Sequence, residues 1–159
     1  SMWPYADLCN KLFQAVNQAS RLKDLKVYYF HNCIYGELFT KPGCMWRDRI
    51  STDWVMSNTK REYKVILVGD ATMGPAELLY RGGTVDYMHP NDKPGIRWLE
   101  EIRKRYPASV WMNPLHEKLW NGDYYTSRTV EMVKQVFPMY PLTVKGLEAA
   151  VRELLKESL

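Results

Sequence analysis

The chain has 159 residues, a usual length for one domain, and we expect a single domain over residues 1–159. Apolar residues make up 46% of the sequence and charged residues 25%, which argues against a disordered chain. The net charge of +4 is too small to indicate a nucleic-acid partner unless the basic residues cluster on one face. No apolar run approaches the ~18 residues that a membrane span needs, and the three cysteines form no C-x-x-C pair. We therefore expect a cytoplasmic chain with no membrane and no nucleic-acid partner.

The first sixty residues predict a helix at each end and strands between them. Apolar residues recur with a 3.6-residue period from Tyr5 to Ser20, which predicts an amphipathic helix. The aromatic and β-branched run Lys26–Tyr35 predicts a buried strand, and Glu37–Phe39 predicts a short strand after a turn. Ser51-Thr52-Asp53 is typical of a helix start, so residues 54–60 are expected to form a short helix.

The rest of the chain alternates strands with helices. Strands are expected over residues 65–70, where the run is apolar like a strand covered on both faces, and over residues 109–113. Helices are expected over residues 75–80, from Pro94, over residues 127–137, and after a capping Thr143. The buried stripe of the last helix is predicted to be Val144, Leu147, Val151, Leu154 and Leu155. This alternation predicts the α/β class, with a mostly parallel sheet covered by helices on both faces.

Asp70 is the first candidate for chemistry, because ligands of such folds bind at the carboxyl ends of the strands and Asp70 stands at such an end. A carboxylate there could hold a divalent cation, accept a phosphoryl group or act as a base. The plain alternative is a turn aspartate that caps the next helix. The sequence lacks G-x-G-x-x-G after a strand, G-x-x-x-x-G-K-[ST] and G-x-S-x-G, so three common nucleotide and hydrolase sites are disfavoured.

Two other groups of residues have plain structural explanations. His31 and Cys33 would share one face of a strand and could bind metal with Cys44, but their spacing fits no zinc pattern. Burial in a strand explains them more simply. The basic run over residues 103–105 falls on the polar side of a predicted helix, where a solvated face is the usual meaning.

Three segments together resemble bacterial von Willebrand factor A domains of the CoxE-like type. They are residues 30–35 (Phe-His-Asn-Cys-Ile-Tyr), residues 68–75 (Val-Gly-Asp-Ala-Thr-Met-Gly-Pro), and the run from His89 through Asn113 to Leu115. The resemblance covers nearly the whole chain. It implies a doubly wound, Rossmann-like sheet and a metal-ion-dependent adhesion site, built by three loops at the carboxyl edge of the sheet. Hydroxyl and carboxylate oxygens suit Mg²⁺, and an open coordination position receives a carboxylate of the partner.

The resemblance implies three metal ligands in this chain. Asp70 matches the aspartate of the third loop, and Thr52 best matches the threonine of the second, with Ser51 as its competitor and a helix N-cap as the plain alternative. Ser1 would be the last serine of the first loop's Asp-x-Ser-x-Ser motif; alternatively, Ser1 and Met2 are a cloning remnant. The motif's first carboxylate is absent from the sequence, so Mg²⁺ or another divalent cation is expected to bind weakly.

The resemblance implies a protein-interaction module rather than an enzyme. Its partner would be another protein, for example a MoxR-type AAA+ ATPase that would act with it in metalloenzyme maturation. The alternative is a Rossmann-like hydrolase or phosphotransfer enzyme that uses Asp70.

The resemblance also implies that the family's first strand is absent, so that the chain would be the C-terminal part of a longer protein. That strand would lie between Val27–Ile34 and Val65–Val68. We expect its place to be filled by another polypeptide, by exchange between two copies, or by direct pairing of the two flanking strands. Unpaired sheet edges would favour self-association.

Overall fold

The computed structural model describes residues 24–84, 91–121 and 127–156, which form a mixed α/β fold. The helix expected over Tyr5–Ser20 and the candidate ligand Ser1 lie outside these residues. In the described part, no helix is long and apolar enough to cross a membrane.

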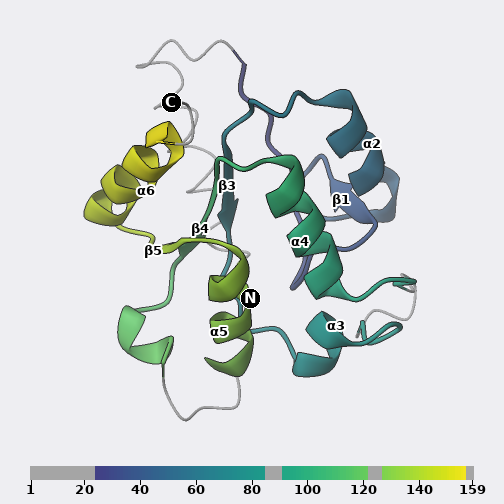
Figure 1. Cartoon of the computed structure of the whole chain (residues 1–159). Helices are drawn as coiled ribbons and strands as arrows, with labels where there is room; N and C mark the ends of the chain where they lie inside the picture. Colours follow the sequence, from purple (N-terminus) through teal and green to yellow (C-terminus); the bar gives the residue numbers. More distant parts are fainter. Residues whose placement is uncertain (1–23, 85–90, 122–126, 157–159) are drawn as a thin grey trace.

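A three-stranded parallel sheet organises the larger part of the molecule (Figure 1). Its order is β3 (Val65–Val68), β4 (Ser109–Asn113) and β5 (Met139–Pro141), with β4 in the centre. The register places Leu67 opposite Trp111, and Trp111 opposite Met139. Every residue of β4 is buried, because strands flank it on both edges and helices cover both of its faces.

Side-chain alternation along β4 separates two layers of core. Trp111 packs with apolar residues of α3 (Pro75–Leu79), α4 (Gly95–Arg105) and α5 (Ser127–Val136). Val110 and Met112 pack on the opposite face against Ala150 and Leu154 of α6 (Val144–Lys156). The expectation of a parallel sheet with helices on both faces is therefore confirmed for the described residues.

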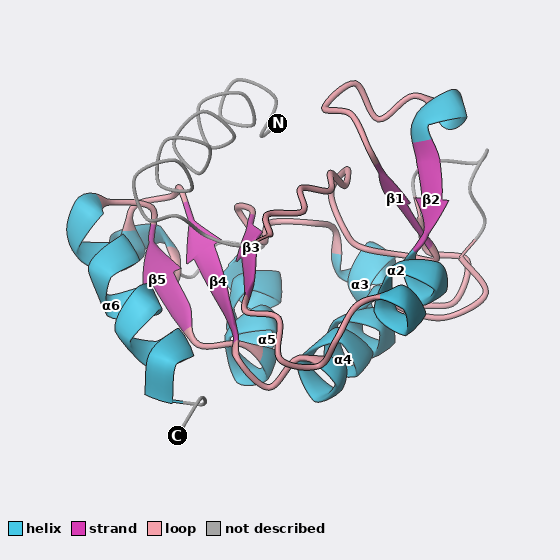
Figure 2. Ribbon diagram, turned by 90° about the horizontal axis from the view of Figure 1, so that it is seen from above, coloured by secondary structure: helices cyan, strands magenta, loops and turns pink. Residues whose placement is uncertain are grey.

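A separate antiparallel hairpin lies beyond β3, on the side away from β4 and β5 (Figure 2). It consists of β1 (Glu37–Phe39) and β2 (Arg49–Ser51), with the 3₁₀ turn η1 (Trp46–Asp48) between them. Strand β2 leads directly into α2 (Thr52–Asn58). The short strand expected at residues 37–39 is confirmed, whereas β2 was not predicted.

The strand expected over Lys26–Tyr35 is wrong. In this segment only Tyr29 forms a bridge, with Phe39, and the neighbouring residues are irregular. An apolar run becomes a strand only where a neighbour accepts its backbone hydrogen bonds, and β1 offers three residues on one side. Direct pairing of this segment with β3, one of the three expectations for the absent strand, is not found among the described residues.

Helix α6 buries a different face from the predicted one. The exposed fractions of Val144, Val151 and Leu155 are 77%, 41% and 54%, so three members of the predicted stripe point away from the core. The buried residues are instead Gly146, Ala150 and Leu154, which follow the i, i+4 spacing of one helix face. Small residues let the helix approach the sheet closely. The prediction from apolar periodicity counted only large apolar residues and therefore missed them.

The basic run at the end of α4 is structural rather than only solvated. Arg105 donates from Nε to the carbonyl of Met56 at 2.9 Å and from Nη2 to the carbonyl of Thr59 at 2.5 Å. The last carbonyls of a helix lack partners within it, so one guanidinium satisfies two acceptors at the end of α2. Arg103 donates to the carbonyl of Ser109 at 2.9 Å, and only Lys104 of the three is exposed with no recorded contact.

Candidate functional site

Asp70 lies just after the carboxyl end of β3, where the sequence predicts it. Its carboxylate oxygen Oδ1 accepts a hydrogen bond from the backbone N–H of Thr72 at 3.0 Å, and its side chain is half-buried. The intervening residue, Ala71, has a φ of +58°, a left-handed conformation that costs an alanine free energy. Asp70 is thus a turn aspartate, and the turn holds its carboxylate at the edge of the sheet.

Asn113 ties the ends of two neighbouring strands together. It is the last residue of β4 and is fully buried, and its Nδ2 donates to the carbonyl of Asp70 at 2.9 Å. Its Oδ1 accepts from the N–H of Leu115 at 2.9 Å. The sequence analysis did not single out Asn113 as a site residue. A polar residue that ends an apolar strand and precedes a proline is the signal that could have found it.

The loop after Asp70 is held from below by α5. The hydroxyl of Thr129, which is fully buried, lies 2.8 Å from the carbonyl oxygen of Ala71 and 3.1 Å from that of Met73, and donates to them. Ala71 and Met73 are themselves buried. The Asp70 carboxylate therefore stands on a turn that is anchored on both sides, by Asn113 and by Thr129.

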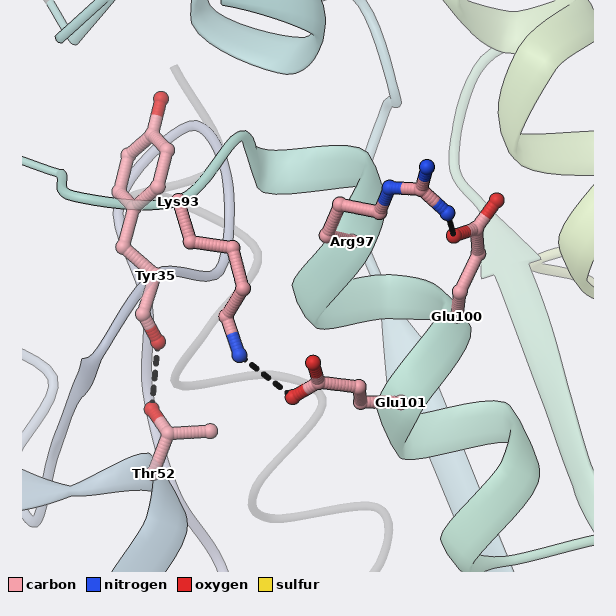
Figure 3. A network of polar contacts seen from close by, with 6 residues as sticks. All are labelled: Tyr35, Thr52, Lys93, Arg97, Glu100 and Glu101. Carbon is pink, nitrogen blue, oxygen red and sulfur yellow. Dashed lines mark hydrogen bonds and ion pairs between the residues drawn. The ribbon is translucent and has the colours of Figure 1, made fainter. Parts of the chain in front are cut away.

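Thr52 begins α2 but does not cap it. The N-cap is its competitor Ser51, whose hydroxyl accepts from the N–H of Trp54 at 3.2 Å. The Thr52 hydroxyl donates instead to the backbone carbonyl of Tyr35 at 2.5 Å, as Figure 3 shows, and its side chain is 1% exposed. Among the described residues no hydrogen bond joins Thr52 or Ser51 to Asp70. The hydroxyl proton of Thr52 is committed to Tyr35, while its oxygen keeps lone pairs that a cation could use.

Tyr35 connects the start of α2 with α3. Its carbonyl receives the Thr52 hydroxyl, and its own hydroxyl donates to the carbonyl of Glu77 at 3.0 Å. Burial, the largest cause, together with the nearby Cys33 and Glu77 raises the pKa of Tyr35, so this hydroxyl stays protonated and keeps donating. Glu77 is itself buried, and its Oε2 has no hydrogen-bond partner in the described part of the chain.

Beside this link, two ion pairs lie along the exposed face of α4 (Figure 3). Lys93 contacts Glu101 at 2.5 Å and Arg97 contacts Glu100 at 3.0 Å. All four side chains are at least 31% exposed, so these pairs contribute little to stability. These ion pairs are exposed, whereas the Thr52 hydroxyl that donates to Tyr35 is buried.

The described residues do not form a ready-made metal cluster of charged or soft ligands. No group of three histidine, cysteine, aspartate or glutamate side chains within them is close enough to hold an ion. His31 is exposed, Cys33 is buried and Cys44 is half-buried, and both cysteines are free thiols. Among the described residues, the recorded hydrogen bond of the Asp70 carboxylate comes from a backbone N–H and not from a side chain.

No protein-family model matches the chain, and neither a curated protein nor a solved structure is significantly similar to it.

Proposed function

We propose that this chain is a protein-interaction domain of the von Willebrand A type, with a doubly wound sheet whose carboxyl edge binds its partner through a divalent cation. The observation that carries the proposal is the anchored Asp70 carboxylate at the carboxyl end of β3. In parallel α/β sheets this edge is where ligands bind. A carboxylate that is fixed there by a backbone N–H, with no side-chain hydrogen bond from the described residues, suits the binding of a cation.

We propose that the site holds Mg²⁺ only weakly. Asp70 has one oxygen, Oδ2, that accepts no hydrogen bond from the described residues, and it would supply the anionic ligand. Thr52 and Ser1 are the proposed hydroxyl ligands. One carboxylate with neutral hydroxyls leaves half of the ion's double positive charge unbalanced, so affinity for the ion alone is low and a partner's carboxylate is needed to complete the shell. The bound ion supplies attraction for that carboxylate.

The partner follows from this chemistry. It is a protein that presents an aspartate or glutamate, and a MoxR-type AAA+ ATPase in the cytoplasm is the candidate that the sequence resemblance suggests. Because the cation binds both Asp70 and the partner's carboxylate, the two binding events strengthen each other by the same factor.

The test is a titration with Mn²⁺, a paramagnetic substitute for Mg²⁺, followed by broadening of amide signals in NMR spectra. We expect the amides of Thr72 and Asn113 to broaden at millimolar Mn²⁺. Asp70→Asn keeps the acceptor for the Thr72 N–H but removes the charge, so the broadening should disappear. Asp92→Asn, the same change at an exposed aspartate, is the matched control and should leave it unchanged.

A second titration tests the partner chemistry. Adding a glutamate-containing peptide should increase the affinity for Mn²⁺ in the unmodified protein and not in Asp70→Asn. Broadening that persists in Asp70→Asn, or a peptide effect that is equal in both proteins, would refute the proposal.

A further inference from the structure

An apolar cavity of about 330 Å³ lies between β3 and the segment of residues 25–30, on the edge of β3 that faces the β1–β2 hairpin. Residues 25–30 and residues 64–68 both line it. Apolar side chains of α2 and α4, among them Val55, Met56 and Ile102, also line it. We call this cavity the β3 slot. Figure 2 shows β3 at the edge of its sheet, with the β1–β2 hairpin as a separate pair of strands on that side.

The edge of β3 along the slot has no recorded backbone partner among the described residues. In the ladder with β4, the N–H of Val65 donates to the carbonyl of Ala108 at 2.9 Å, and the N–H of Gly69 donates to that of Met112 at 3.1 Å. Because a strand residue directs its N–H and C=O to one side and the next residue directs them to the other, Ile66 and Val68 face away from β4. Within the described residues no strand pairs with that edge.

On the opposite side of the slot, the segment of residues 25–30 is bonded to β1 at one residue. Tyr29 and Phe39 exchange both of their backbone hydrogen bonds, each at 2.8 Å. The flanking residues Tyr28 and Phe30 are irregular and do not extend this bridge into a strand. Neither residue has a recorded backbone partner among the described residues.

At each end of the slot a side-chain contact joins its two sides. At the start of β3, the hydroxyl of Tyr63 donates to the carboxylate of Asp24. At the far end, the ring of Phe30 packs edge-on against Trp111, with centroids 6.1 Å apart, over Gly69. A Cβ at Gly69 would lie 2.9 Å from the Trp111 ring, so this approach depends on glycine. The two sides remain connected without pairing with each other.

We propose that the β3 slot is a binding site for one extended, apolar segment of another polypeptide, which enters as a β-strand and pairs with the Ile66–Val68 edge. The backbone donors and acceptors along the Ile66–Val68 edge specify a peptide backbone rather than a compact apolar molecule. The apolar lining specifies aliphatic, uncharged side chains. Exchange between two copies does not meet the need, because β3, β4 and β5 are each already paired and a swapped strand empties one place as it fills another.

The proposal is independent of the metal site and is tested in EDTA. The probe is an acetylated, amidated peptide of alternating valine and threonine flanked by lysines, titrated to 1 mM into the 159-residue chain. Hydrogen exchange is followed by NMR. We expect one peptide to bind per chain and the amides of Ile66 and Val68 to exchange at least tenfold more slowly. The amides of Val65 and Leu67, which already face β4, serve as internal references and should change little.

Two controls separate strand pairing from simple apolar binding. The same peptide with alternate backbone amides N-methylated keeps the side chains but loses the donors on one edge, so it should fail to protect Ile66 and Val68. Val27→Trp places bulk in the slot, and Val144→Trp places the same bulk at a valine that is 77% exposed. We expect peptide binding to weaken at least tenfold in Val27→Trp and to be unchanged in Val144→Trp.

Three results would overturn the proposal. Equal binding of the N-methylated peptide would assign the slot to apolar ligands in general. Protection of Ile66 and Val68 that rises with protein concentration, with sedimentation as a dimer and no peptide binding, would assign it to self-association. No protection at 1 mM peptide would show that the slot does not bind a strand. The Mn²⁺ titration would still test the metal site at Asp70 independently.

Discussion

Strand β4 and the segment Lys26–Tyr35 are both short apolar runs rich in aromatic or β-branched residues, yet they have opposite fates. All five residues of β4 are buried and it pairs on both edges. The segment Lys26–Tyr35 forms a single bridge at Tyr29, and residues 27–30 are half-buried. Composition is similar in the two, so the difference lies in the neighbours that each finds.

β3 lies between these two regions, and its two edges differ in strand pairing. Toward β4 it has a complete parallel ladder, and toward the hairpin it has none within the described residues. Only Leu67 of its four residues is buried, although the sequence predicts a strand covered throughout. The comparison teaches that burial of a strand depends on the strands beside it as much as on its own side chains.

The largest effect that tests this comparison is expected from Trp111→Ala in β4. Trp111 is 1% exposed, packs on Phe30 and Phe137, and donates from Nε1 to the carbonyl of Gly69 at 2.7 Å. Truncating a buried tryptophan costs about 3–5 kcal/mol. Tyr28→Ala, an aromatic truncation in the poorly paired segment, should cost about 1 kcal/mol. Urea denaturation measures both, and equal losses would show that the segment is packed as firmly as β4.

The sequence predicts best the elements that are long or strongly periodic. The strand over residues 109–113 and the helix after Pro94 were expected nearly as they are, because local pattern and tertiary burial agree there. Strand β5 was missed, since Met139-Tyr140-Pro141 is short and contains a proline, and its place is set by pairing with β4. The strand over Lys26–Tyr35 was wrong because pairing is a property of the partner as well.

The site follows the same division between local and distant causes. The position of Asp70 at the carboxyl end of β3 could be predicted, because an apolar run followed by Gly-Asp is a local pattern. The partner of the Thr52 hydroxyl is a carbonyl 17 residues away, and the Asn113–Asp70 bond spans 43 residues. No local pattern encodes contacts of that separation. The metal-ligand roles of Asp70, Thr52 and Ser1 stay predictions for the Mn²⁺ titration.

An intermediate effect is expected from Arg105→Met, because the end of α2, beside the slot, depends on hydrogen bonds from a side chain of α4 to its backbone. Arg105 satisfies the carbonyls of Met56 and Thr59 at the end of α2. Methionine keeps much of the aliphatic stem but makes neither bond, so we expect a loss of about 1–2 kcal/mol. Hydrogen exchange should accelerate in α2 more than in β4.

Lys104→Met is the matched control for this change. Lys104 neighbours Arg105 on α4 but is exposed and has no recorded contact, so its replacement should change stability by less than ~0.5 kcal/mol. Similar losses in the two variants would mean that removing charge from α4, rather than breaking the tie to α2, is responsible.

The smallest expected effect concerns Cys33, which lies in the same segment as Tyr29 but is 2% exposed. Burial raises the pKa of its thiol to about 12, from 9.0 for an ordinary thiol. Well below pH 9 the thiol is protonated in both the folded and the unfolded chain, so there it contributes no pH dependence. Between pH 9 and 12 only the unfolded chain loses the proton, so the free energy of unfolding falls as pH rises. At pH 10 the loss is on the order of 1 kcal/mol.

Urea midpoints at pH 8 and pH 10 should therefore differ more in the unmodified protein than in Cys33→Ala, which keeps the contributions of the tyrosines. If both proteins lose the same stability, the Cys33 thiol is hydrated in the folded chain. Cys33 would then be as loosely packed as residues 27–30 of the same segment.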